Sequence, residues 1–360
     1  MGILRKCPIS QSKGKMKMIY KLLFGTLIDF YDEKMLQSYS VYMLFMIAFA
    51  FGSTFLSLKY FKKMLPKDQG REFAVNGDLS QGKARGCGLI FITTFCLTAA
   101  LFMPLDVEYI IYLVLIYGAM ITGYLDDRSE TPWGNLKKGL CDLVISLGVA
   151  LDYWYFNDSY VQLPLLHMSF HMPAVVFIIL AGVLVWTSIN VTNCTDGVDG
   201  LCTALVMTVL MTFILMRGVI TMTCGRTFID FTPVMMLAVL AAYLWFNCSP
   251  STMLMGDAGS RSLGVLLAVL FLMSGDPFGY IPMCIVIILD GGLSLLKVSF
   301  IRFLHMDNFM KGIRTPLHDH ARKNMGWSDT QVVMRFTIIQ LMFDICYLAI
   351  TNYDKILSLN

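Results

Sequence analysis

Two asparagines and two aspartates stand close together where one apolar segment ends and the next begins, between residues 174–189 and 201–216. They are Asn190, Asn193, Asp196 and Asp199. Carboxylates and carboxamides beside hydrocarbon are costly unless they are solvated or given partners. The pattern is therefore typical either of helix caps in an ordinary polar loop or of residues that line a site.

Further polar groups occur at the ends of other apolar segments, and alone each has an ordinary explanation. An aspartate pair is a common helix cap, and Gly256-Asp257-Ala-Gly is a turn signal. Single acids inside apolar runs, such as Asp142 and Asp290, favour a packing role. The candidates for a shared site are Asp126, Asp127, Asn247, Asp257, His318 and His320, with the cations Lys83 and Lys138.

The chemistry of these groups favours phosphoryl transfer with a hard metal ion. Carboxylate oxygens with few imidazoles suit Mg²⁺, or Mn²⁺, better than zinc. Lysine, arginine and histidine side chains can neutralise a diphosphate, while a carboxylate without a metal to bind can act as a general base.

The composition indicates a membrane protein that spans the bilayer several times. The chain has 360 residues, of which 56% are hydrophobic and 15% are charged, and its mean hydropathy is +0.65. A soluble domain carries about 25% charged residues. The ten cysteines and five histidines have no spacing typical of a disulfide framework or a zinc site. We expect no cleaved signal peptide and no nucleic-acid partner.

Hydropathy predicts an all-α fold with about ten transmembrane helices. The apolar segments are residues 39–58, 88–105, 109–125, 139–156, 174–189, 201–216, 232–246, 262–273, 280–303 and 331–351. Residues 1–38 are expected to form a basic, interfacial segment with a short amphipathic helix over residues 19–30, and residues 39–360 a single transmembrane catalytic domain. Gly291 and Gly292 are expected to bend the ninth span.

The loops predict which side of the membrane the polar groups face. Residues 59–85 are rich in lysine and arginine, whereas residues 157–173 contain neither. Basic loops are cytoplasmic. An even number of spans separates successive polar groups, so all of them should lie on this one cytoplasmic face.

Four motifs resemble the polyprenyl-phosphate sugar-1-phosphate transferases, and within them the phospho-N-acetylmuramoyl-pentapeptide transferases. Asn193-Cys-Thr-Asp196-Gly-Val-Asp199-Gly-Leu resembles the Asn-Leu-Thr-Asp-Gly-Leu-Asp-Gly-Leu pattern of that branch. The other three motifs of that branch also have similar counterparts in this chain. They are the motif ending in Asp126-Asp127, the motif Asn247 to Ser260, and Thr315-Pro-Leu-His318-Asp-His320. The similarity extends from about residue 80 to residue 340.

The resemblance implies ten helices, Mg²⁺, and transfer of phospho-MurNAc-pentapeptide from a UDP carrier to undecaprenyl phosphate with release of UMP. On this reading Asp257 is the principal metal ligand, Asp126 the base toward the lipid phosphate, and Asp127 a support for either. His318 and His320 would act on the diphosphate. The expected nucleoside and sugar contacts are Asn190, Asn193, Asp196, Asp199 and Asn247, with Lys83 and Lys138 on phosphate.

The chain departs from the family pattern in places that bear on these roles. Asp319 replaces the middle histidine of the late loop, Leu254 stands where the family often has phenylalanine, and the segment around Lys83 differs.

The alternatives are a sibling enzyme that transfers GlcNAc-1-phosphate and a cation-coupled transporter, which would place its acids near the membrane midplane. We expect a bacterial plasma-membrane enzyme that contacts lipids and can form a homodimer.

Overall fold

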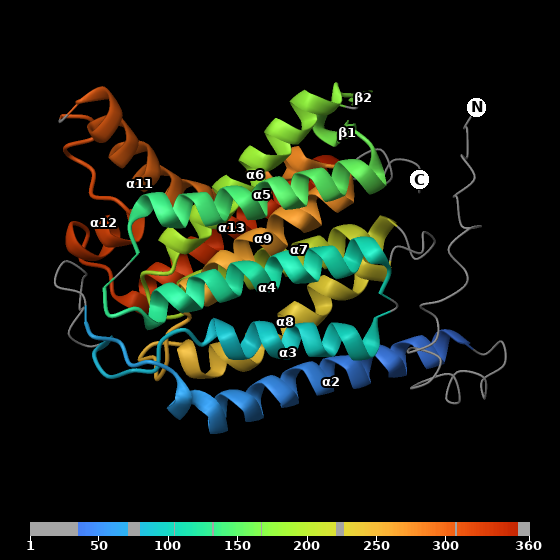
Figure 1. Cartoon of the computed structure of the whole chain (residues 1–360), viewed down its shortest axis with the longest axis horizontal. Coiled ribbons are helices and arrows are strands. Elements are labelled where there is room, and N and C mark those ends of the chain that lie inside the picture. The colour runs from blue at the N-terminus through green and yellow to red at the C-terminus, as the bar shows by residue number, and fades with distance from the viewer. Residues whose placement is uncertain are drawn as a thin grey trace.

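The structure is a computed structural model that describes residues 35–70, 80–103, 105–131, 133–166, 168–220, 227–306 and 308–351. The expected interfacial helix over residues 19–30 lies outside the described residues. Within the described part the fold is a bundle of long helices with one short hairpin (Figure 1).

The long helices follow the predicted apolar segments closely. They are α2 (Met35–Phe61), α3 (Gly88–Phe102), α4 (Val107–Arg128), α5 (Asn135–Asn157), α6 (Ala174–Thr195), α7 (Leu201–Ile220), α8 (Thr227–Asn247), α9 (Gly256–Ser274), α11 (Ile285–Leu304) and α13 (Asp329–Thr351). Shorter helices are α10 (Tyr280–Met283), α12 (Leu317–Lys323) and the 3-10 turns η1 (Lys62–Met64), η3 (Pro164–Leu166) and η4 (Pro277–Gly279). Strands β1 (Tyr160–Leu163) and β2 (Met168–His171) pair antiparallel, with Val161 opposite Phe170.

The prediction of a polytopic all-α membrane protein is confirmed. In the described part seven helices are long and apolar enough to cross a membrane, and α10 with α11 makes an eighth if the bent pair counts as one span. The helix α3 and residues Leu201–Met216 of α7 are shorter apolar helices. Each of the ten predicted segments thus corresponds to a helix, while length and composition support seven or eight spans.

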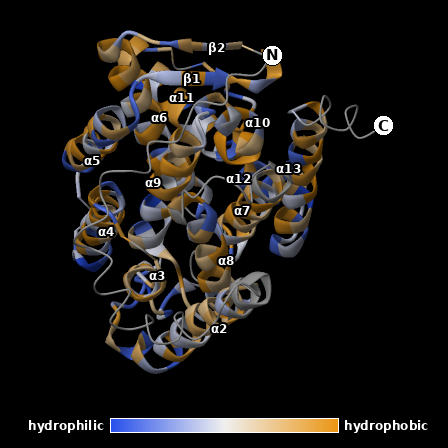
Figure 2. Ribbon diagram, turned by 90° about the vertical axis from the view of Figure 1, so that its right-hand side faces the viewer, coloured by the Kyte–Doolittle hydropathy of each residue, from blue (hydrophilic) through white to orange (hydrophobic). Residues whose placement is uncertain are grey.

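Helix α9 is the centre of the bundle, and every residue from Gly256 to Met273 is buried. After Ser262 its residues are almost all apolar, and a helix that is apolar on every side is stable only when other helices surround it. Figure 2 shows this arrangement end-on, with α9 inside the ring of helices. Gly264 permits a close approach of α6, because a Cβ there would overlap the backbone of Ile189.

The bend expected at Gly291 and Gly292 lies instead between α10 and α11, which meet at 89° beside Cys284. Gln340 of α13 supplies the hydrogen bonds that the break removes: its amide oxygen accepts from Val286 N at 3.0 Å, and its amide nitrogen donates to Met283 O at 2.9 Å. Gly291 instead allows α6 to approach α11 closely, because a Cβ there would overlap the backbone of Val191 on α6.

Candidate active site

A pocket of about 580 Å³ joins residues from all four sequence motifs. It lies where α4 and α6 end and where α5, α9 and α12 begin, at the end of the bundle that carries α12 in Figure 1. Its charged lining residues are Lys67, Arg85, Asp126, Asp127, Arg128, Glu130, Lys138, Asp196, Asp257, Asp319 and Arg322, with His318 beside them.

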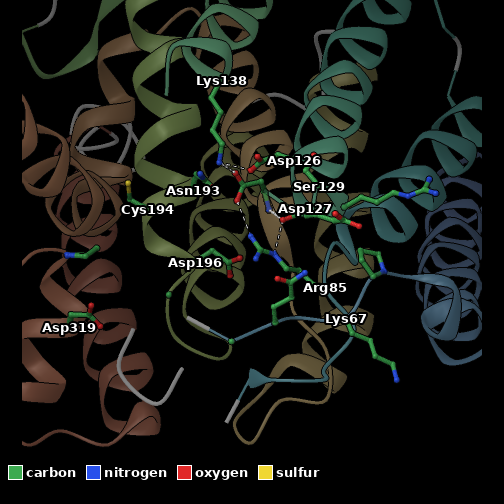
Figure 3. A pocket seen from close by; sticks show the side chains of 18 of the residues that line it. Lys67, Arg85, Asp126, Asp127, Ser129, Lys138, Asn193, Cys194, Asp196 and Asp319 are labelled. Atoms are coloured by element: carbon green, nitrogen blue, oxygen red, sulfur yellow. Dashed lines mark hydrogen bonds and ion pairs between the residues drawn. The ribbon is translucent and has the colours of Figure 1, made fainter. Parts of the chain in front are cut away.

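The Lys138 ammonium bridges two carboxylates from different helices (Figure 3). Its Nζ lies 2.5 Å from Asp126 Oδ2 and 3.0 Å from Asp257 Oδ2. The other oxygen of Asp126 accepts a hydrogen bond from the backbone N–H of Trp133 at 2.7 Å, just before α5 begins. One cation is therefore already held between Asp126 and Asp257, both of which are buried.

Asp127 caps the first turn of α9 from the neighbouring helix α4. Its Oδ1 accepts from Asp257 N at 3.1 Å and its Oδ2 accepts from Ala258 N at 3.0 Å. Carboxylates are favourable at helix N-termini, where backbone N–H groups lack partners. Gly256 makes this approach possible, because it has φ +72° and a Cβ there would overlap the Asp127 carboxylate. Asp127 thereby fixes the position from which Asp257 faces the pocket.

Arg85 joins the loop before α3 to the carboxylate cluster. Its Nε donates to Asp127 Oδ1 at 2.9 Å, one Nη is 3.3 Å from Asp68 Oδ1, and the other is 3.9 Å from Asp257 Oδ1. Burial lowers the pKa of the guanidinium, but Asp127, Asp257 and Asp68 together raise it above its ordinary value. Arg85 is therefore a permanent cation in the pocket.

His318, at the start of α12, is oriented by an aspartate from α11. Asp290 accepts from the His318 backbone N–H at 2.8 Å, and its second oxygen lies 2.8 Å from His318 Nδ1. The ring's Nε2 then faces the loop after α6, where a Cβ on Gly197 would overlap it. With Nδ1 held by Asp290, Nε2 borders the pocket and lies 3.8 Å from Asp319 Oδ1.

Asp319 and Arg322 connect α12 to the same loop. Arg322 donates to Asp319 Oδ1 at 2.7 Å and to Gly197 O at 3.1 Å, and its other Nη lies 3.2 Å from Asp329 Oδ1. The carboxylate that replaces the family's middle histidine is thus neutralised by a neighbouring arginine. His320 does not line the pocket; its Nδ1 accepts from Arg314 N at 3.3 Å.

The structure brings seven of the twelve sequence-predicted site residues together in the lining of this pocket: Asp126, Asp127, Lys138, Asn193, Asp196, Asp257 and His318. Asn193 accepts from Ser260 Oγ at 2.7 Å, which links α6 to α9.

The remaining predicted residues besides His320 lie around the pocket. Lys83 Nζ is 3.5 Å from Asp199 Oδ2 and donates to Ser251 Oγ at 2.9 Å. Asn190 lies one helical turn away from the pocket, and its side chain donates to Trp186 O at 2.9 Å. Buried Asn247 accepts from Gly200 N at 3.1 Å and donates to Met253 O at 3.1 Å, so it joins the loop after α6 to the loop after α8.

Sequence reasoning placed Asp319 on the same face without assigning it a role, and it did not select Arg85, Asp290 or Arg322 as site residues. Asp290 had a usable signal, since it is a single acid inside an apolar run, and such acids face protein interiors or cavities. The cations Arg85 and Arg322 had no such signal, because many other lysines and arginines lie in the same loops.

A carboxylate cluster with surrounding cations at one end of a helical bundle fits a membrane-embedded transferase, and residues 109–275 match the family model described as glycosyl transferase family 4. Curated relatives from several bacteria carry the name phospho-N-acetylmuramoyl-pentapeptide-transferase, and three of them illustrate the range of similarity. The one from Treponema pallidum (strain Nichols) is 39% identical over 88% of this chain and 91% of its own length.

The second relative, from Clostridium perfringens (strain 13 / Type A), is 30% identical over 74% of this chain and 82% of its own length. The third, from Rickettsia prowazekii (strain Madrid E), is 28% identical over 73% of this chain and 78% of its own length. The chain belongs to the phospho-N-acetylmuramoyl-pentapeptide transferases, a family of multi-pass enzymes of bacterial membranes. The family and the enzyme class predicted from the four motifs are confirmed.

Proposed function

We propose that this pocket transfers phospho-MurNAc-pentapeptide from UDP-MurNAc-pentapeptide to undecaprenyl phosphate, yielding lipid I and UMP. The observation that supports the proposal best is the Lys138 ammonium shared by Asp126 and Asp257. Such an arrangement holds cationic charge where a diphosphate must be neutralised, and positioning with charge neutralisation accounts for most catalysis of phosphoryl transfer.

The residues present fit a Mg²⁺ ion held mainly by the Asp257 carboxylate, which lines the pocket, and Mn²⁺ by the same chemistry. Mg²⁺ is usually bound by one or two carboxylates together with substrate phosphates and water. In the described part, no group of three or more His, Cys, Asp or Glu side chains is placed to hold a metal alone. Asp127 contributes least, because both of its oxygens already accept backbone N–H groups of α9. When bound, the ion would polarise the diphosphate of the nucleotide sugar.

The protein groups around that position have separate roles in the reaction. Asp257 is the principal metal ligand, and Asp126 acts as the base that keeps the lipid phosphate ionised. Lys138 and Arg85 neutralise phosphate charge, while His318, oriented by Asp290, presents its Nε2 to the diphosphate. Asn193 and Asp196 line the same pocket and bind the sugar and nucleoside.

A nucleotide-sugar assay tests the proposal. Purified protein is given undecaprenyl phosphate with UDP-MurNAc-pentapeptide or with UDP-GlcNAc, with Mg²⁺ or with EDTA, and UMP is measured. We expect UMP only with the pentapeptide substrate and only with metal. Turnover of UDP-GlcNAc at an equal rate would instead favour the sibling transferase, and the variant Asp257→Asn controls for contaminating hydrolases.

The site should face the cytoplasm of a bacterial plasma membrane. In a background where Cys7 and Cys224 and the exposed Cys248 and Cys346 are serine, Ser129→Cys should resist a membrane-impermeant maleimide in intact cells. Ser169→Cys, in the exposed strand β2, should react under the same conditions. Labelling of Ser129→Cys from outside would contradict this orientation.

A further inference from the structure

A second polar layer lies one helical turn below the pocket. Asp142 follows Lys138 by four residues on α5, and Arg261 follows Asp257 by four residues on α9. Residues four apart lie on the same face of a helix, about 5–6 Å apart. Both helices begin at the pocket, so Asp142 and Arg261 lie directly beneath the residues that meet there.

Asp142 and Arg261 form an ion pair within the bundle. They are only 2% and 1% exposed. Asn190 of α6 joins them, since its Nδ2 lies 3.5 Å from Asp142 Oδ2, and it precedes the pocket residue Asn193 by three positions. The layer therefore repeats, one turn deeper, the α5–α9 link that Lys138 makes with Asp257.

Stability alone is a poor reason for this ion pair. Replacing a buried ion pair by apolar residues of similar volume is often neutral or stabilising, and ionised groups are most costly within a membrane. The pair is also incompletely satisfied: Arg261 Nη1 is buried and has no hydrogen-bond partner in the described part of the chain. A well-packed pair of leucine and methionine would fill the same space without that cost.

The function of the ion pair follows from its position beneath Lys138. A lysine side chain is long and flexible, so its ammonium stays at one point only if its backbone is held there. Asp126 is anchored by Trp133 N and Asp257 by its helix start, whereas Lys138 is in the first turns of α5. We propose that Arg261 is a positioning residue for the transfer reaction: through Asp142 it holds α5 against α9 at the depth where the Lys138 ammonium lies between Asp126 and Asp257.

The first test measures the position of Lys138 without any turnover. Purified protein without substrate is treated with an amine-acylating reagent, and acetylation of each lysine is followed by mass spectrometry. The double variant Asp142→Leu/Arg261→Met should raise the rate at Lys138 by about threefold or more, the scale expected for groups coupled through a shared contact. Lys297, whose Nζ donates to Ile313 O at 2.7 Å, is the internal control. An unchanged rate at Lys138 overturns the proposal.

The second test rests on the proposed function and uses a kinetic cycle. Removing the pair should lower kcat by about tenfold and leave KM for the nucleotide sugar nearly unchanged, because displaced groups lose orientation rather than affinity. In a Lys138→Met background the same removal should lower kcat by less than about twofold. Effects that multiply in the two backgrounds would show that the pair does not act through Lys138, and would overturn the proposal.

Two further variants separate positioning from folding. Arg261→Lys keeps the charge and one donor toward Asp142, which the arginine contacts through a single guanidinium nitrogen, so kcat should stay within about threefold of the parent. Thr54→Val removes a buried hydrogen bond to Thr94, 2.7 Å long and remote from the pocket, so it should lower the unfolding temperature without altering kcat. If the parent enzyme releases no UMP, the proposed function fails, while the acylation measurement still decides whether Arg261 positions Lys138.

Discussion

Two buried polar clusters in this bundle both contain aspartates that belong to helices, and they differ in what surrounds those aspartates. One is the pocket cluster of Asp126, Asp127 and Asp257. The other is formed by Gln340 and Asp344 of α13, both fully buried, and contains no charged nitrogen. Asp344 accepts from Gln340 Nε2 at 2.7 Å and from Thr212 Oγ1 at 2.9 Å, and Gln340 completes the break between α10 and α11.

The difference shows what identifies a functional site in a membrane protein. Burial of acids within helices is common to both clusters and therefore decides nothing by itself. The pocket cluster also contains cations that each contact two or more carboxylates, and it borders an open cavity. The α13 cluster uses neutral donors and closes a helix break, so its function is structural.

The largest effect on activity should come from Asp257→Asn. The variant keeps the side chain's size but removes an anionic ligand for a hard cation, so turnover should fall by about 10³-fold or more. Rates measured over a range of Mg²⁺ concentrations, with unfolding temperature as control, check this. Near-normal turnover at ordinary Mg²⁺ would place the metal elsewhere and weaken the contrast between the two clusters.

Asp126→Asn should have a smaller effect that depends on pH. The second pKa of a phosphate monoester is about 6, so a base serves mainly to keep the lipid phosphate ionised in an anionic site. The loss, about 10²-fold at pH 7, should shrink toward pH 9, where the acceptor ionises without help. The measurement is the rate against pH for Asp126→Asn and Asp257→Asn at saturating Mg²⁺. Parallel profiles would assign Asp126 to the metal site instead.

Arg85→Ala should lower kcat by about tenfold, the scale of one charge-assisted contact, and the loss should not vary between pH 8 and 9. The reason follows from the sign of its pKa shift. A guanidinium is cationic below its pKa, and the neighbouring carboxylates raise that pKa above its ordinary value. Its charge is therefore present throughout this alkaline range, and a ratio of variant to parent rates that changes between pH 8 and 9 would contradict the prediction.

The helices and the motifs could be predicted from the sequence, because apolar length and polar interruptions are local signals. The contacts between distant segments could not be predicted from the sequence. The capping of α9 by Asp127 depends on α4 lying against α9 at Gly256, and the ion pair of Asp142 with Arg261 depends on the depth at which α5 meets α9. The sequence of one helix does not indicate where the other will lie.

The misplaced bend has the same origin. Glycines inside an apolar segment predicted a kink at Gly291 and Gly292, yet at Gly291 the missing side chain allows Val191 to approach. The actual break near Cys284 is possible because Gln340, more than fifty residues later in the chain, supplies the hydrogen bonds.

Thr212→Val should have the smallest effect on activity and sharpens the comparison from the structural side. The substitution preserves volume but leaves Asp344 Oδ2 without the hydroxyl that donates to it at 2.9 Å, while Gln340 still donates to Oδ1. A buried acceptor that loses its donor costs about 1–3 kcal/mol. For a protein of this size that corresponds to a fall in unfolding temperature of roughly a few degrees.

Since neither Thr212 nor Asp344 lines the pocket, kcat and its pH profile should match those of the parent enzyme at temperatures where both are folded. Thermal unfolding and UMP release measured on the same preparation check both statements, and a loss of kcat without a loss of stability would show that the α13 cluster is coupled to the pocket and is more than a structural one.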